Sequence, residues 1–271
     1  MRPGATGSED WGETWAPIET LNQHPYRPYW TGTGGGDSCL HSVDIDPRDP
    51  AHVYVSISMG GTYETLDAGK SWDIVPHRLV ATTELGKKMM QVFEDYATQE
   101  ARIPPNVDPA AADEFHKFHL DPKDPDRLWG QAHIGTFRLD RGSGSGWVDV
   151  TEGLPSFHGF PLAVTKREPD AVYTVPLAFE DDNFRVVRDQ FAVYRTRDRG
   201  ATWDRLTDGL PGPHDYQSVY REGLDTDGLD QEGVYVGTSN GQVYASTDGG
   251  DHWQRLPGTL PPVLSVTCHV A

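Results

Sequence analysis

Short stretches of alternating apolar and polar residues recur along the chain, a pattern typical of β-strands that bury one face. Residues 52–57 and 233–238 are clear examples, and residues 72–75 form a shorter stretch of the same kind. Asp- and Pro-rich segments at 46–50 and 121–125 have the composition of turns. The pattern predicts an all-β protein built from short strands and tight turns.

A turn motif recurs in phase with these strands, with Ser or Thr, Asp, Gly and a final Trp at fixed positions. The copies end at Trp15, Trp72, Trp203 and Trp253, with a degenerate copy at Asp140, Gly142 and Trp147. In this motif the hydroxyl and the carboxylate can bind backbone amides, Gly permits a positive φ, and Trp can be buried between sheets. We therefore assign its acidic residues to folding: Asp10, Asp67, Asp198 and Asp248.

One period of the chain contains four predicted strands, with the motif between the third and the fourth. Repeated four-stranded units are the blades of a β-propeller. The sequence thus predicts one propeller domain over residues 1–271, with four complete blades and partial blades at its ends. The chain starts at a turn between a third and a fourth strand and ends with a single strand at 263–270. Because a propeller closes to remove sheet edges, we expect a missing N-terminal part or an open arc, whose edge could support an oligomer.

The second interval between motif tryptophans is longer than the others by about 20 residues. This places an insertion at 80–112. Within it, residues 84–99 carry apolar side chains at helical spacing, including Leu85, Met89 and Val92, behind a cap at Thr82 or Thr83. The spacing predicts one helix, which either covers an apolar edge or gates a site.

The charge and composition of the chain limit the classes of partner that it can be expected to bind. The formal net charge is −18, from 41 acidic and 23 basic residues, so the surface repels phosphate backbones and nucleic acid is not an expected partner. Residues 1–15 show no apolar core of signal-peptide length, and the sequence shows no run of the ~18 apolar residues that a membrane-spanning helix needs. We therefore expect a cytoplasmic protein without membrane contact, in which Cys39 and Cys268 are reduced.

Beyond the turn motif, further segments stand out at 24–30, 34–41, 115–117, 131–133 and 159–162. Together with these segments, the motif resembles the Asp box of the sialidase superfamily and of sortilin-like ectodomains. The whole chain resembles bacterial BNR-repeat proteins that are described as glycosyl hydrolases or exo-sialidase-like. The resemblance implies a propeller fold, and it implies relatives that are longer at the N-terminus.

A fold does not fix a reaction. The resemblance to sialidases would imply an arginine triad, a Tyr nucleophile with a Glu partner, and an Asp acid. The one match to the Arg-Ile-Pro signature of that superfamily is Arg102, Ile103 and Pro104, which lies in the insertion and not at the first-blade position. We therefore do not expect sialidase activity.

Active sites of this superfamily lie on the propeller face opposite the Asp boxes. Aligned blades place four residues at the start of the innermost strand: His41, His116, Phe160 and Glu222. We predict that Glu222, His116 and His41 are catalytic, because carboxylates and imidazoles at one axial opening suit acid–base chemistry and glycoside hydrolysis. Substrate-binding residues are predicted around the same opening at His24, Arg27, Trp30, Arg185 and His158.

The same histidines suit a divalent metal such as zinc, iron or copper, with His41, His116 and His133 as the predicted ligands. No other cofactor is indicated. The alternatives are that each imidazole bonds a loop backbone or a carboxylate, or that it acts directly as an acid or base.

Three functions remain open at this stage. The first is a glycosidase-like enzyme that acts on a glycan or small polar molecule in the axial mouth, with or without metal assistance. The second is a propeller scaffold that binds a ligand or protein without turnover, and the third is a His-ligated metalloenzyme of another reaction class.

Overall fold

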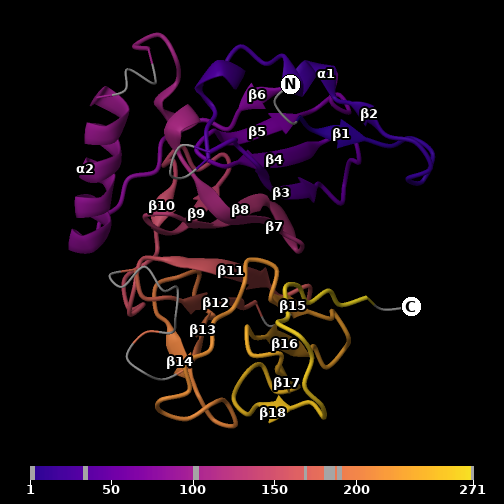
Figure 1. The fold of residues 1–271 in the computed structure, drawn as a ribbon, viewed down its shortest axis with the longest axis vertical. Coiled ribbons are helices and arrows are strands. Elements are labelled where there is room, and N and C mark those ends of the chain that lie inside the picture. The colour runs from indigo at the N-terminus through magenta and orange to yellow at the C-terminus, as the bar shows by residue number, and fades with distance from the viewer. Residues whose placement is uncertain are drawn as a thin grey trace.

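The computed structural model describes residues 4–32, 36–99, 104–167, 170–179, 187 and 191–269, without the side chains of 93–99. Four antiparallel sheets of four strands dominate this part of the chain (Figure 1). In each sheet the strands follow one another in chain order. The sheets have the strand count and order that the sequence predicts for propeller blades.

The strands of the four blades have the following bounds. Blade 1 contains β3 (Leu40–Ile45), β4 (Val53–Ile57), β5 (Gly61–Thr65) and β6 (Asp73–Ile74). Blade 2 contains β7 (Phe115–Asp121), β8 (Asp124–Ala132), β9 (Gly135–Asp140) and β10 (Val148–Asp149). Blade 3 contains β11 (Gly159–Val164), β12 (Val172–Pro176), β13 (Val193–Thr196) and β14 (Asp204–Leu206). Blade 4 contains β15 (Leu224–Thr226), β16 (Val234–Gly237), β17 (Val243–Ser246) and β18 (Gln254–Arg255).

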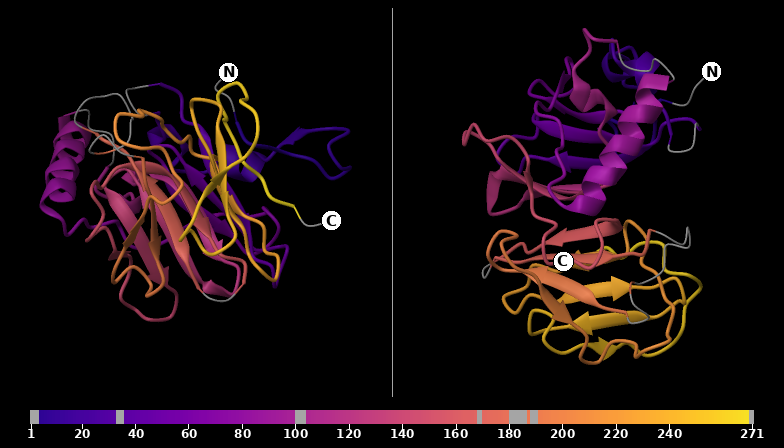
Figure 2. Two further views of the ribbon diagram at one scale, coloured as in Figure 1. Left: turned by 90° about the horizontal axis from the view of Figure 1, so that it is seen from below. Right: turned by 90° about the vertical axis from the view of Figure 1, so that its left-hand side faces the viewer.

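The innermost strand of each blade contacts the innermost strand of the next, so that β3, β7, β11 and β15 follow one another about a shared axis. Figures 1 and 2 show the blades in this succession, with blade 1 at the top and blade 4 at the bottom of the first view. The all-β propeller architecture with four complete blades is confirmed.

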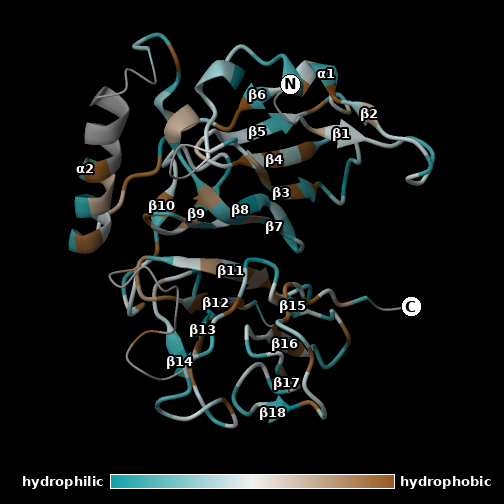
Figure 3. Ribbon diagram, viewed as in Figure 1, coloured by the Kyte–Doolittle hydropathy of each residue, from teal (hydrophilic) through white to brown (hydrophobic). Residues whose placement is uncertain are grey.

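The hydrophobic core lies between the blades. Tyr54 of blade 1 packs in one cluster with Phe118 and Phe137 of blade 2, and Tyr173 of blade 3 packs in another with Val236 of blade 4. Figure 3 shows apolar residues along strands such as β4 and β11, while many of the loops are polar. Each blade is therefore held mainly by the faces of its neighbours.

The predicted turn motif forms the same hydrogen-bonded cage in all four clear copies. Between β5 and β6, Asp67 Oδ1 accepts from the backbone amide of Ser71 at 2.8 Å and Asp67 Oδ2 accepts from its hydroxyl at 2.7 Å. Thr65 accepts from the amide of Gly69, whose φ is +83°. The carboxylates serve folding, as the sequence predicts.

The tryptophans of the motif are not all buried. Trp72 and Trp253 are buried, whereas Trp15 is 65% exposed. The burial between sheets that the motif leads us to expect for its Trp is therefore wrong for Trp15. Its turn joins only the two-stranded pair β1 (Thr6–Gly7) and β2 (Ala16–Pro17), and no four-stranded sheet of the described chain contains it.

We expect the variant Asp67→Ala to lower Tm by roughly 2–4 °C at pH 7, because it removes the acceptor for Ser71. These hydrogen bonds hold the pKa of Asp67 at about 2, below its ordinary 3.8. A depressed pKa stabilises the fold above the unfolded-state value and ceases to do so as pH falls through the folded-state value. The Tm difference from wild type should shrink between pH 4 and pH 2. Thermal unfolding scans of both proteins across this pH range test the prediction. Lys70→Ala is the control. An unchanged Tm for Asp67→Ala would contradict a stabilising role for the cage.

The predicted helix is α2 (Glu84–Gln99), which lies on the outside of the sheets (Figure 2). Thr83 Oγ1 accepts from the backbone amide of Gly86 at the start of the helix, so the predicted cap is confirmed. Met89 and Met90 pack against the core of blade 2, whereas Leu85 and Val92 are exposed. The short helix η2 (Pro109–Ala112) ends the insertion.

The first and last segments pack beside the end blades. The first one contains α1 (Glu19–Asn22) and η1 (Arg27–Tyr29), and Leu21 joins the core of blade 1. Near the other end, Ser265 forms a parallel bridge with Glu222, and the amide of Val266 donates to the Glu222 carbonyl at 2.7 Å. This stretch runs beside blade 4 in the direction expected for a further innermost strand. None of the described helices is long and apolar enough to cross a membrane.

Candidate functional site

A β-bulge interrupts the innermost strand at the same step in three blades. In blade 1 the pairing jumps from Leu40 to Ser42, which leaves His41 as the extra residue. In blade 2 it jumps from Phe115 to Lys117, which leaves His116. The irregularity of blade 3 lies between 159 and 162 and includes Phe160. Because a bulge redirects the side chain that it inserts, the repeat itself aims these side chains.

The two bulge histidines bond the next blade in the same way. Nδ1 of His41 lies 2.7 Å from the carbonyl oxygen of Phe115, and Nδ1 of His116 lies 2.7 Å from that of Gly159. A carbonyl only accepts, so in each ring Nδ1 carries the proton and Nε2 keeps its lone pair. Burial lowers the pKa of both histidines, helped by Arg221 at His41 and by His133 at His116. Both imidazoles are therefore neutral at pH 7.

Arg221 and Glu222, which lie just before β15 of blade 4, contact the bulge region of blades 1 and 2. Nη2 of Arg221 lies 3.4 Å from Nε2 of His41, and its guanidinium lies 5.6 Å from the ring centroid of Phe160. Lys117 Nζ donates to a carboxylate oxygen of Glu222. We call the six residues that meet here the axial cluster: His41, His116, Lys117, Phe160, Arg221 and Glu222. The Glu222 side chain is 45% exposed, so solvent or a ligand can reach this carboxylate.

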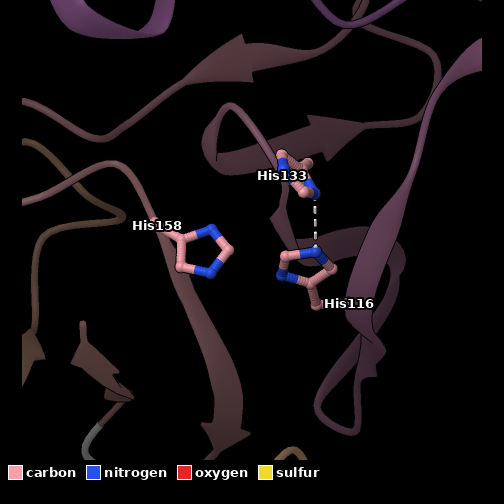
Figure 4. Close-up of side chains that lie close together, drawn as sticks. All are labelled: His116, His133 and His158. Atoms are coloured by element: carbon pink, nitrogen blue, oxygen red, sulfur yellow. Dashed lines mark hydrogen bonds between the residues drawn. The ribbon is translucent and has the colours of Figure 1, made fainter. Parts of the chain in front are cut away.

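A second group of imidazoles adjoins the axial cluster through His116. Nε2 of His116 lies 3.0 Å from Nδ1 of His133, and one ligand atom from each of His116, His133 and His158 lies within 4.8 Å of the others (Figure 4). We call these three residues the imidazole trio. All three are buried. Burial lowers the pKa of His158 to about 4, so this ring is also neutral at pH 7.

Glu114 stands behind the imidazole trio. Its Oε2 lies 3.3 Å from Nδ1 of His133, and its Oε1 accepts from the hydroxyl of Ser58 at 2.9 Å. Burial raises its pKa, but the hydrogen bond with His133 and the nearby imidazoles outweigh burial and lower the pKa to about 2. Glu114 is therefore a buried, ionised carboxylate.

The sequence-predicted metal set needs one correction. His116 and His133 do come together, but the group within coordinating reach among the described residues is completed by His158 and not by His41. The ring of His41 lies 6.4 Å from that of His116, with Nδ1 on the Phe115 carbonyl and Nε2 toward Arg221.

Comparisons with known proteins found similar proteins in sequence and in structure. No family model matches the chain. A xyloglucanase from a Paenibacillus species is 25% identical over 266 residues, covering 89% of this chain and 23% of that protein. An ancestral GH74 enzyme matches in structure with a TM-score of 0.56 and 20% identity, over 86% of this chain and 25% of that one. A NanB sialidase mutant from Streptococcus pneumoniae is similar at a TM-score of 0.34 and 14% identity, over 71% and 26%.

The strand order and the matching GH74 fold decide the classification. The chain has the fold of an Asp-box β-propeller. This is the fold that the resemblance to BNR-repeat proteins implies. The propeller spans about a quarter of the length of the xyloglucanase and of the GH74 enzyme.

The predicted ligand-binding residues of the propeller do not form one group. Trp30 is 2% exposed and donates through Nε1 to the hydroxyl of Tyr63 at 2.9 Å, so it is a core residue and its predicted substrate-binding role is wrong. His24 packs edge-on against Tyr63 at 4.7 Å. Arg27 lies over Trp30 and lines a cleft of about 250 Å³ that also includes Cys39. These residues were predicted at the axis because the sequence did not reveal how their segment folds back onto blade 1.

Two site residues of the propeller have weak sequence signals. Lys117 was not predicted, although it follows the bulge residue His116 directly. His158 was predicted to bind substrate and not metal. The His158 carbonyl accepts from the amide of Leu177, just as the Glu114 carbonyl accepts from the amide of His133. His158 in blade 3 and Glu114 in blade 2 therefore occupy equivalent positions, each just before the innermost strand. Arg185, the loop at 180–186, Arg102 and Ile103 lie outside the described residues.

Proposed function

We propose that this Asp-box propeller is a glycoside-hydrolase-like enzyme that acts on a glycan or a small polar molecule at the axial cluster. The observation that carries the proposal is the exposed carboxylate of Glu222, which Lys117 holds at the point where the innermost strands converge. The similarity to a xyloglucanase and to a GH74 fold supports the same class of reaction.

Each residue of the axial cluster has a role in this proposal. Glu222 is the carboxyl group that acts as acid or base: it gives a proton to the leaving glycosidic oxygen or takes one from the attacking water, the steps for which glycosidases use Asp or Glu. Lys117 positions Glu222, while the neutral imidazoles of His41 and His116 accept hydrogen bonds or protons. The ring of Phe160 offers an apolar face against which a sugar ring can pack.

The test is a hydrolysis assay with the full chain. Xyloglucan and a panel of chromogenic aryl glycosides are incubated with the protein, and released reducing ends or aryl alcohol are measured. We expect turnover of at least one substrate, abolished by prior heat denaturation. Absence of turnover on every substrate would refute the hydrolase proposal.

A second candidate, a propeller that binds such ligands without turnover, is favoured by one observation. Glu222 is already bonded to Lys117 and His41 already contacts Arg221, as in a network that fixes shape. Isothermal titration with xyloglucan oligosaccharides that are bound but not cleaved would support this candidate over the first.

A further inference from the structure

We propose that His116, His133 and His158 form a three-histidine site for a divalent metal ion, with Zn²⁺ as the best-fitting ion. The candidate ligand atoms of the trio lie within 4.8 Å of one another. Zinc binds imidazole nitrogen at ≈ 2.0–2.1 Å, so that nitrogens around a tetrahedral zinc are about 3.3 Å apart. Nε2 of His116 and Nδ1 of His133 lie 3.0 Å apart, close to this value, in a hydrogen bond that Nδ1 donates. Metal binding would release that proton, and modest side-chain movement would adjust the remaining separations.

The three ligands come from separate elements that the blades fix in place. His116 is the bulge residue of β7, His133 follows β8, and His158 precedes β11 in the next blade. The backbone amide of His133 donates to the Glu114 carbonyl, and that of Leu177 donates to the His158 carbonyl. The site therefore spans the boundary between blades 2 and 3 and is organised by their packing. Figure 4 shows the His158 ring on one side and the rings of His116 and His133 on the other.

The surroundings of the trio match those of metal ligands. A metal-bound histidine usually donates its second ring nitrogen to a carbonyl or carboxylate. His116 does so through Nδ1, which donates to the Gly159 carbonyl and leaves Nε2 free of a proton. Glu114 lies 3.3 Å from Nδ1 of His133 and places a negative charge behind the trio. A divalent cation would offset this buried charge.

Aromatic rings enclose the site. The ring of Phe160 lies 4.7 Å from that of His116 and 5.2 Å from that of His158. The ring of Phe179 lies 5.2 Å from His158 and 6.0 Å from His133. An apolar wall of this kind limits water and strengthens electrostatic binding. Three protein ligands leave one tetrahedral position for water or a ligand, as in three-histidine catalytic zinc sites.

The experiment measures metal binding without any sugar, so its result is separate from that of the hydrolase assay. The full chain is stripped with a chelator, dialysed, and titrated with Zn²⁺ against a chromophoric competitor, and with Co²⁺ by visible absorption. We expect one Zn²⁺ per chain and an intense tetrahedral Co²⁺ spectrum. Lack of stoichiometric Zn²⁺ binding, or a weak octahedral Co²⁺ spectrum, would overturn the site.

Variants locate the ion. We expect His158→Ala and His133→Ala to weaken Zn²⁺ binding by more than the ~10–100-fold that loss of an outer partner costs. The matched control is His41→Ala, which removes the bulge histidine of blade 1 outside the trio and should retain one Zn²⁺ per chain. If His158→Ala does not fold, His158→Gln keeps a polar side chain of similar length. Wild-type affinity in a folded His158 variant, or loss of binding only in His41→Ala, would contradict the proposal.

Discussion

The variant Glu222→Gln is expected to reduce glycoside hydrolysis about 10²–10⁴-fold in kcat, the range that a positioned acid or base contributes. Glutamine keeps the size of the side chain and can still accept a hydrogen bond from Lys117, but it cannot transfer the proton. The Lys117 side chain is only 12% exposed, but its ammonium keeps the amide oxygen of the glutamine as a hydrogen-bond acceptor. The fold should therefore persist, and KM should change much less than kcat.

Two further variants separate catalysis from general damage. Glu152→Gln alters an exposed glutamate in the turn after β10 and should leave kcat and Tm unchanged. Lys117→Met removes the positioning ammonium and leaves the Glu222 carboxylate in place, so we expect a smaller loss of kcat and a displaced pH profile. Steady-state kinetics with circular dichroism melting make the comparison. A Glu222→Gln enzyme with wild-type kcat would remove Glu222 from the mechanism.

The fold could be predicted because its signals are local and periodic. The hydrogen-bond cage around Asp67 depends on residues within four positions of it, so the motif can be recognised without tertiary information. Because the motif recurs along the chain, each recurrence marks a further repeat, and the repeats together predict the four blades. The helix at 84–99 was predicted at its observed bounds for the same reason, since its cap and spacing are local.

The candidate site could be predicted only in part, because its contacts join distant segments. Lys117 and Glu222 are 105 residues apart, and Arg221 and His41 are 180 apart. Aligning the repeats correctly placed His41, His116 and Phe160 at one step, but it does not reveal a bulge, which depends on how the neighbouring strand pairs. Whether His41 or His158 lies close enough to His116 and His133 to complete the trio therefore depends on the packing of the blades, which the sequence does not reveal.

The largest expected loss of stability follows from Gly209, in the turn after β14. Its φ is +80°, and an added Cβ would lie 1.8 Å from the carbonyl oxygen of Trp253. The turn cannot easily move away from Trp253, because the Asp208 carbonyl accepts a hydrogen bond from the amide of Trp253 at 2.9 Å. Left-handed strain costs ~1–2 kcal/mol and overpacking adds ~1–3 kcal/mol. We expect Gly209→Ala to lower the free energy of unfolding by about 2–5 kcal/mol.

Gly153 supplies a matched control, since it occupies the corresponding turn after β10. Its φ is +91°, but an added Cβ would lie 3.7 Å from the nearest atom, Cδ1 of Trp203, which is an ordinary contact. Gly153→Ala should therefore cost only the strain of about 1–2 kcal/mol. Urea unfolding followed by tryptophan fluorescence gives both values through the midpoint and slope. Equal losses for the two variants would mean that backbone strain alone acts at Gly209, and that the close approach of blade 4 to the preceding turn does not constrain the fold.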